Sequence, residues 1–151
     1  MRKRLLGILF ADLEGCWTLQ RTIYGFGVMD GSVGIREVGP GILEYREEGL
    51  VELDSGKSFV ATRAYYYCLE GEDIVVRFRL SEEACDVLHR LRFAFGDHGA
   101  WPSEASDIHF CGKDVYHGYY SFPTPDEIRI RMVIIGPKKD SVIETRLSRT
   151  S

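Results

Sequence analysis

A Gly-x-Trp motif near the start of the chain, Gly15-Cys16-Trp17, and an arginine near its end, Arg146, constrain the fold more than any other feature. Many short segments with the alternation of β-strands lie between them. In small antiparallel barrels, a tryptophan that enters the first strand covers the base, and an arginine on the last strand packs on its ring as a cation–π contact. We therefore expect Trp17 to be buried at the base of a barrel, with Arg146 stacked on it or capping the same end of the barrel.

Alternation of apolar and polar residues predicts a regular series of strands, separated by turns rich in glycine, proline and aspartate. The expected strands cover residues 16–24, 33–38, 42–53, 58–69, 74–80, 87–95, 108–110, 114–122, 127–135 and 141–147. Residues 25–34 read as a turn-rich connection, and 96–107 as the longest loop. The fold class is therefore all-β, a single antiparallel barrel of about eight to ten strands that forms one domain over residues 1–151.

The N-terminus combines a basic stretch with the apolar run Leu5–Ala11, as a secretory signal peptide does. The run is short for a signal peptide, and Asp12 and Glu14 follow it at once. Leu5, Leu9 and Leu13 share helical spacing. We expect a short helix over residues 4–13 that packs against the barrel, with a cleaved signal peptide as the alternative.

Composition narrows the possible partners. The net charge of −4 and the isoelectric point near 5.6 argue against a duplex nucleic-acid binder, which normally carries a basic face. No apolar stretch approaches the roughly 20 residues that span a bilayer. The four cysteines are scattered without a C-x-x-C pair, so we expect no metal site and mostly buried, reduced thiols in a cytoplasmic protein.

Several short motifs occur in an order that resembles a family of small calycin-like β-barrels, a domain-of-unknown-function family. They are Gly15-x-Trp17-x-Leu19-x-Arg21, Tyr45-Arg46-Glu47-Glu48-Gly49, Val76-Arg77-Phe78, His109-x-Cys111-Gly112-x-Asp114-x-Tyr116 and Gly136-Pro137-Lys138-Lys139-Asp140. The resemblance covers most of the chain, from about Gly15 to Arg146. It implies a barrel like those of lipocalins and fatty-acid-binding proteins, and it implies no reaction, because a fold does not carry a function.

Strand alternation from Trp17 turns Arg21 inward, and the same reasoning brings Glu47 and Glu144 inside. Buried charges need partners, so these residues form either structural ion pairs or a seat for the polar end of a ligand. The densest polar cluster lies around His109. We expect a pocket inside the barrel, without a cofactor, lined by ligand-binding residues among Arg21, Tyr45, Glu47, Tyr65, Arg77, His89, His109, Tyr116 and Tyr120.

The leading functional hypothesis is a small-molecule binding protein that holds a ligand with a polar or anionic end. A cofactor-free enzyme of the isomerase or lyase type would instead need His109 or Glu47 within hydrogen-bond reach of a second titratable group. A third hypothesis is an interaction module whose open end docks a partner, including a second copy in a homodimer. No residue is assigned a catalytic role.

Overall fold

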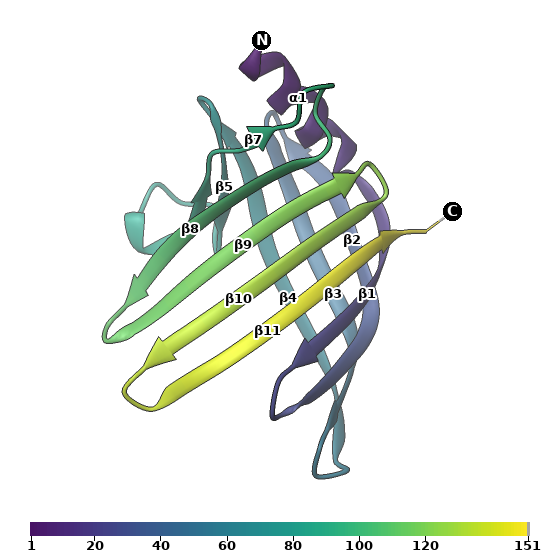
Figure 1. Ribbon diagram of the computed structural model, residues 1–151, viewed down its shortest axis with the longest axis vertical. Coiled ribbons are helices and arrows are strands. Elements are labelled where there is room, and N and C mark those ends of the chain that lie inside the picture. The colour runs from purple at the N-terminus through teal and green to yellow at the C-terminus, as the bar shows by residue number, and fades with distance from the viewer. Residues whose placement is uncertain (151) are drawn as a thin grey trace.

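The computed structural model describes residues 1–150, and its strands form one antiparallel sheet that curls into an open barrel (Figure 1). The expected all-β barrel with a short N-terminal helix is confirmed, with eleven strands rather than eight to ten. The elements are α1 (Arg2–Asp12), β1 (Gly15–Ile23), β2 (Gly27–Gly39), β3 (Ile42–Leu53), β4 (Ser58–Glu70), β5 (Asp73–Arg77), the 3-10 turn η1 (Ala84–Asp86), β6 (Val87–Leu91), β7 (Ala94–Phe95), β8 (Ser103–Cys111), β9 (Asp114–Thr124), β10 (Glu127–Gly136) and β11 (Lys139–Arg149).

The sheet order is β6-β5-β4-β3-β2-β1-β11-β10-β9-β8-β7, so the first and last long strands pair in the middle. In Figure 1, β8 to β11 form a front layer, and β1 to β4 cross behind it. Helix α1 lies at one end, which we call the closed end. The hairpins after β1, β3, β8 and β10 point to the other end, which we call the open end.

The N-terminal segment is a helix, as its leucine spacing predicts. Leu6, Leu9 and Phe10 are buried, and Leu13 is buried just after the helix ends. These side chains join the core at the closed end. The apolar spacing of the segment is therefore explained by packing against the barrel, because one face of the helix covers the core.

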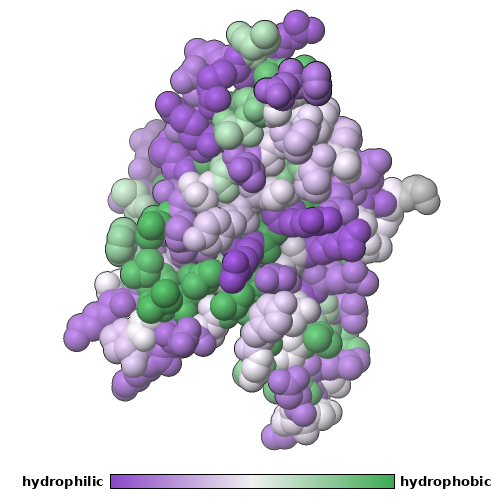
Figure 2. Space-filling model, viewed as in Figure 1, coloured by the Kyte–Doolittle hydropathy of each residue, from purple (hydrophilic) through white to green (hydrophobic). Residues whose placement is uncertain are grey.

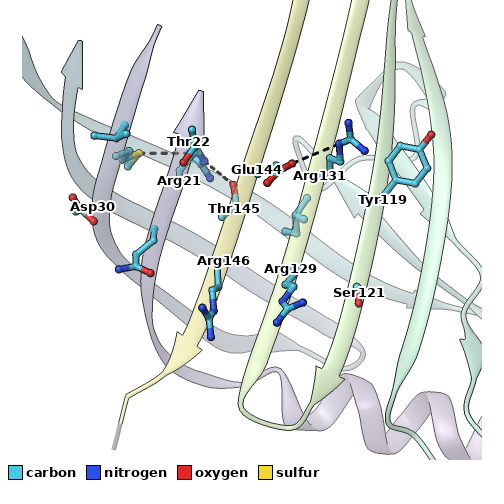
Figure 3. Close-up of a pocket in the computed structure, with 14 residues that line it drawn as sticks. Arg21, Thr22, Asp30, Tyr119, Ser121, Arg129, Arg131, Glu144, Thr145 and Arg146 are labelled. Atoms are coloured by element: carbon cyan, nitrogen blue, oxygen red, sulfur yellow. Dashed lines mark hydrogen bonds and ion pairs between the residues drawn. The ribbon is translucent and has the colours of Figure 1, made fainter. Parts of the chain in front are cut away.

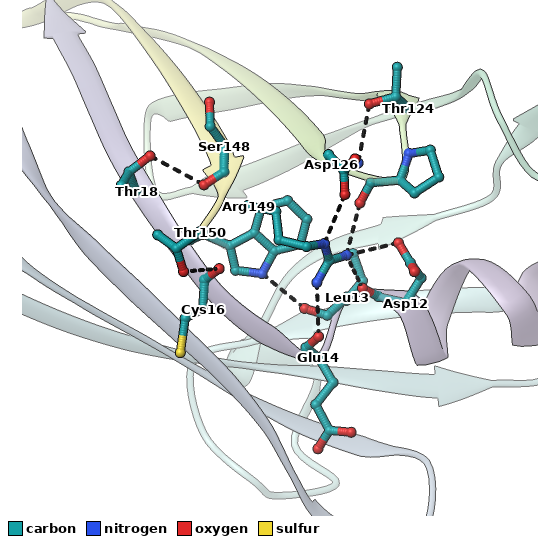
Figure 4. A network of polar contacts seen from close by, with 12 residues as sticks. Asp12, Leu13, Glu14, Cys16, Thr18, Thr124, Asp126, Ser148, Arg149 and Thr150 are labelled. Atoms are coloured by element: carbon teal, nitrogen blue, oxygen red, sulfur yellow. Dashed lines mark hydrogen bonds and ion pairs between the residues drawn. The ribbon is translucent and has the colours of Figure 1, made fainter.

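Trp17 is buried at the closed end with 1% of its surface exposed, as expected, and its indole N–H donates to the carbonyl of Leu13 at 3.0 Å. Arg146 does not stack on the ring, although it pairs with Glu127 at the start of β10, at the same end of the barrel. Arg149 stacks on the ring instead, with its guanidinium carbon 4.2 Å from the centre of the ring. Arg149 also donates to the carbonyls of Asp12 and Glu14, which ties β11 to the end of the helix (Figure 4).

The error at Arg146 comes from the face assigned to β11. Leu147 and Thr145 are buried, whereas Arg146 and Glu144 are exposed on the other face. The expectation that Glu144 points inward is therefore also wrong: it accepts a hydrogen bond from the exposed Tyr24. Side chains alternate along a strand, so an error of one residue moves every side chain to the opposite face.

The glycines of residues 25–34 lie mostly within β2 rather than in a turn-rich connection. Gly31 faces Gly49 across the β2–β3 ladder, and a Cβ atom on either would overlap the backbone of the opposite strand. These glycines allow β2 and β3 to approach closely. Glycine inside a strand often indicates such a close approach of another backbone. The predicted loop 96–107 also ends early, because β8 begins at Ser103.

All four cysteines are free thiols, but only Cys68 is buried; Cys16, Cys85 and Cys111 are exposed, so the expectation of mostly buried thiols is wrong. Within the described residues, none of the helices has the length and apolar character needed to cross a membrane.

Candidate functional site

The face of the sheet that carries Trp17, Tyr45 and Leu147 encloses the core, and we call it the inner face. An ion pair lies on it at mid-height. Arg21 on β1 donates two hydrogen bonds to Glu47 on β3, at 2.7 and 2.8 Å, and the hydroxyl of Tyr45 donates to the same carboxylate at 2.7 Å. The Nε of Arg21 donates to Thr145 at 2.8 Å. The two charges are thus paired within the barrel wall, as buried charges require.

The pKa values of this cluster follow from its geometry. Burial alone would raise the pKa of Glu47, but the hydrogen bonds and charge of Arg21 hold it below its ordinary value of 4.5. Burial and the neighbouring carboxylate raise the pKa of Tyr45 well above 10.0. Glu47 therefore has the titratable neighbour that the enzyme hypothesis asked for, but both of its oxygens are occupied and its charge is held by Arg21. This arrangement suits a fixed anion better than a general base.

Six rings form a continuous row across the inner face, which we call the aromatic belt: Tyr67, Tyr45, Tyr65, Phe78, His109 and Tyr116. Successive ring centres lie 5.7, 5.8, 5.9, 6.0 and 6.0 Å apart. The row runs from β3 and β4, past the end of β5, to β8 and β9. Aromatic neighbours at such distances present flat apolar surface with polar edges.

Strand β4 places three hydrogen-bond donors in line on this face, because residues two apart share a side of the sheet. They are Arg63, Tyr65 and Tyr67, which lie opposite Glu47, Tyr45 and Leu43 on β3. Arg63 donates to the hydroxyl of Tyr65 at 2.8 Å, so the proton of that hydroxyl stays free to donate. The hydroxyl of Tyr67 has no hydrogen-bond partner within residues 1–150, although only 6% of the residue is exposed.

The gap between β6 and β8, of which the two-residue strand β7 covers only the start, is bridged by side chains. Nδ1 of His89 lies 2.8 Å from the Tyr120 hydroxyl, and its Nε2 lies 3.1 Å from the Tyr116 carbonyl. A carbonyl only accepts, so Nε2 carries the proton, and Nδ1 accepts from Tyr120. The ring lies against Gly118, where a Cβ atom would overlap it. The backbone N–H of Arg90 completes the bridge by donating to Asp107 at 2.7 Å.

A hollow of about 710 Å³ lies elsewhere, against β1, β2, β9, β10 and β11. Most of its lining side chains belong to the exposed outer face, as Figure 3 shows for Tyr119, Arg129, Arg131, Glu144 and Arg146. Its arginines are paired with acids, such as Arg131 with Glu144 at 3.8 Å and Arg146 with Glu127 at 3.0 Å. The candidate site is therefore better placed on the inner face, where donors remain unpaired.

Eight of the nine residues proposed from sequence lie on the inner face: Arg21, Tyr45, Glu47, Tyr65, His89, His109, Tyr116 and Tyr120. Arg77 does not. It faces Tyr66 across the β4–β5 ladder, on the outer face, and binds Glu70 and the Ser81 carbonyl at 3.0 and 2.9 Å. Arg77 is therefore not among the side chains that line the inside of the barrel, and Glu47 pairs with Arg21 instead. Arg21 alone of the nine also lines the outer hollow.

Residues 13–149 match the family DUF6314, described as a family of unknown function. The chain belongs to the DUF6314 family. The inner-face cluster, the aromatic belt and the β6–β8 bridge all fall within the matched residues. A comparison with curated proteins finds no match.

Solved structures similar to this DUF6314 chain are β-barrels. The S-type phycobiliprotein lyase CPES from Guillardia theta is 12% identical, covers 100% of this chain and 98% of its own, and has a TM-score of 0.58. The redesigned β-barrel mFAP0, bound to DFHBI, is 11% identical, covers 91% of this chain and 99% of its own, and has a TM-score of 0.50. These likenesses support the barrel fold of the DUF6314 chain.

Sequence reasoning missed Arg63, Tyr67 and Gly118 in this DUF6314 barrel. Alternation from Tyr65 would have found the first two, because they lie two residues before and after it. Gly118 carries no signal of its own, since its role depends on the ring of a distant strand. No group of three or more His, Cys, Asp or Glu side chains among the described residues could hold a metal ion.

Proposed function

We propose that this DUF6314 protein binds a small molecule with a flat apolar body and a polar or anionic end, on the inner face of the barrel. The observation that carries the proposal is the hydroxyl of Tyr67. A buried phenol normally has a hydrogen-bond partner, and this one has none among the described residues. Among residues 1–150, Ser103 Oγ is the side-chain polar atom that is both fully buried and without a hydrogen-bond partner. The Tyr67 hydroxyl also lacks a partner, but it is not fully buried. Part of the hydroxyl therefore remains accessible from the inner face of the barrel.

The neighbouring groups suit an acceptor oxygen of a ligand. Tyr65 has a free hydroxyl proton, and Arg63 is exposed on the same face towards the open end. Carboxylates and carbonyls accept such bonds, and those to a charged group are the stronger. The aromatic belt would cover the body of the ligand. Eight of the residues proposed from sequence lie on the same inner face, and their role in binding stays part of the proposal.

The barrel neighbours are consistent with this function: mFAP0 is a barrel bound to DFHBI, and CPES is named a phycobiliprotein lyase. The four free cysteines support a cytoplasmic setting, because reducing compartments keep thiols unpaired.

The test is binding of the aromatic anion 1-anilinonaphthalene-8-sulfonate to the full chain, followed by fluorescence, together with native mass spectrometry for a co-purified molecule. Tyr67→Phe removes one donor, so we expect affinity to fall about three- to tenfold, as for a single hydrogen bond. Tyr66→Phe is the matched control, because Tyr66 is the next residue on the same strand and faces outward.

Two arginines provide a second comparison. Arg63→Met should weaken the binding of the anion, whereas Arg77→Met should leave it unchanged, because Arg77 is on the outer face. The proposal is contradicted if no molecule co-purifies and the probe does not bind, or if the inward and outward variants change affinity equally.

A further inference from the structure

The open end of the barrel carries an unusual concentration of exposed apolar side chains. We call this end the open rim and define it as the hairpin turns after β1, β3, β8 and β10, with the residues that flank them. Its exposed apolar residues are Tyr24, Phe26, Phe59, Val60, Phe110 and Ile135. Phe110, Val60 and Ile135 are 71%, 67% and 58% exposed. Figure 2 shows part of this surface as an apolar area at the lower ends of β8 to β10.

The lysines gather at the same place. The chain has five lysines, and four of them lie in or beside these turns: Lys57, Lys113, Lys138 and Lys139. All four are exposed. By contrast, the chain as a whole has a net charge of −4. The lysines are therefore concentrated at one end of a protein whose net charge is negative.

The acids closest to the hairpin tips are fewer than the lysines. Within the turns and the residues directly beside them, the four lysines face two aspartates, Asp54 and Asp114, whereas Glu52 and Asp140 lie one residue further from the tips. Asp114 is already engaged by Lys139 at 3.4 Å. The more acidic connection between β5 and β6 follows a short strand and lies further up the side of the barrel (Figure 1).

We propose that the open rim docks on the surface of an anionic lipid bilayer. Aromatic and aliphatic side chains at the tips would enter the headgroup region, and the lysine stems would lie along them with their ammonium groups at the phosphates. The shape of the rim favours a bilayer over a protein partner. The apolar residues lie on separate hairpin tips with a notch between them (Figure 2), and a deformable interface can accept such tips without a matching surface.

The inference does not depend on a ligand inside the barrel. It is tested by cosedimentation of the full chain with phosphatidylcholine vesicles, with and without phosphatidylglycerol. We expect binding to the vesicles that contain phosphatidylglycerol, weakened by salt. Phe110→Ser with Ile135→Ser should abolish it. Val38→Ser with Leu69→Ser, a pair of exposed apolar residues near the closed end, should not.

A second pair of variants isolates the charge. Lys113→Gln with Lys138→Gln should weaken vesicle binding by about fivefold for each lysine removed at low salt. Lys3→Gln with Arg4→Gln, which removes the same charge near the closed end, should leave it unchanged.

Three results would overturn the proposal. The chain could fail to bind either kind of vesicle, or the closed-end variants could lose as much binding as the rim variants. It could also form a dimer in light scattering that disappears in Phe110→Ser with Ile135→Ser while no vesicle binding is seen. The last result would identify a second copy of the chain as the occupant of the rim.

Discussion

Removing one partner of the Arg21–Glu47 ion pair should destabilise the protein more than removing both. The side chain of Glu47 is 3% exposed and that of Arg21 is 17% exposed, so a charge left alone there is largely cut off from water. Breaking a buried pair from one side costs about 3–5 kcal/mol. Water still reaches part of Arg21, so we expect about 2–4 kcal/mol for Glu47→Leu or Arg21→Met alone.

The double variant, Arg21→Met with Glu47→Leu, removes both charges. What remains is the Tyr45 hydroxyl, which loses its acceptor, at a cost of about 1–2 kcal/mol. A double-mutant cycle measured by urea unfolding at neutral pH should therefore give a coupling energy of about 2 kcal/mol or more. The penalty of Arg21→Met alone should also shrink on acidification, because burial raises the pKa of a carboxylate that has lost its arginine.

The exposed pair Arg131–Glu144 is the control. It lies on the outer face with the atoms 3.8 Å apart and the side chains 56% and 50% exposed, so either single substitution should cost less than about 1 kcal/mol. If the inner pair behaves like this outer pair, with additive effects, the reasoning that treats Arg21 and Glu47 as buried charges is refuted.

Trp17→Ala should lower the free energy of unfolding by about 3–5 kcal/mol in urea titrations. Arg149→Ala should lower the melting temperature clearly while Arg146→Ala hardly changes it, and equal effects would contradict the assigned stack. Burial lowers the pKa of His89 below its ordinary value of 6.5, so the unfolded chain binds a proton more readily and stability should fall as the pH drops below about 6.5. In the variant His89→Gln, the urea midpoint of unfolding should decrease less as the pH falls. If the decrease is the same as in the original protein, other groups cause it. Gly118→Ala should cost about 1–3 kcal/mol by overpacking against the ring of His89, and a neutral result in the same unfolding assay would mean that the β6–β8 bridge can shift.

The sequence predicts the inner wall of the barrel well where its strands alternate without interruption. From Trp17, steps of two residues give Leu19 and Arg21, both on the inner face in the structure. The same rule places Tyr45 and Glu47 together. The sequence pattern is sufficient here, because in a strand with one buried face the apolar residues show which alternate side chains point inward.

Prediction fails where local patterns have two interpretations. The glycines of β2 read as turns because glycine favours both turns and close strand approach, and only the facing Gly49 distinguishes the two. Arg77 was placed inside by its position in an alternating segment. In the structure Val76 faces inward, so Arg77, the next residue, lies on the outer face, where Glu70 binds its guanidinium. Ile74, Val75 and Val76 are all buried and apolar, so the segment itself does not indicate which of its faces is the inner one.

The C-terminal part of β11 shows how much rests on a single residue. Arg146 and Arg149 are three residues apart, so they lie on opposite faces of the strand. Thr145 and Leu147 are buried, and this face leads by steps of two to Arg149. Arg149 then meets Trp17 directly across the β1–β11 ladder, and Gly15 leaves room for its guanidinium. The Gly-x-Trp motif therefore predicted the contact correctly but not its partner, because the glycine accommodates whichever arginine the register of the last strand brings to the ring.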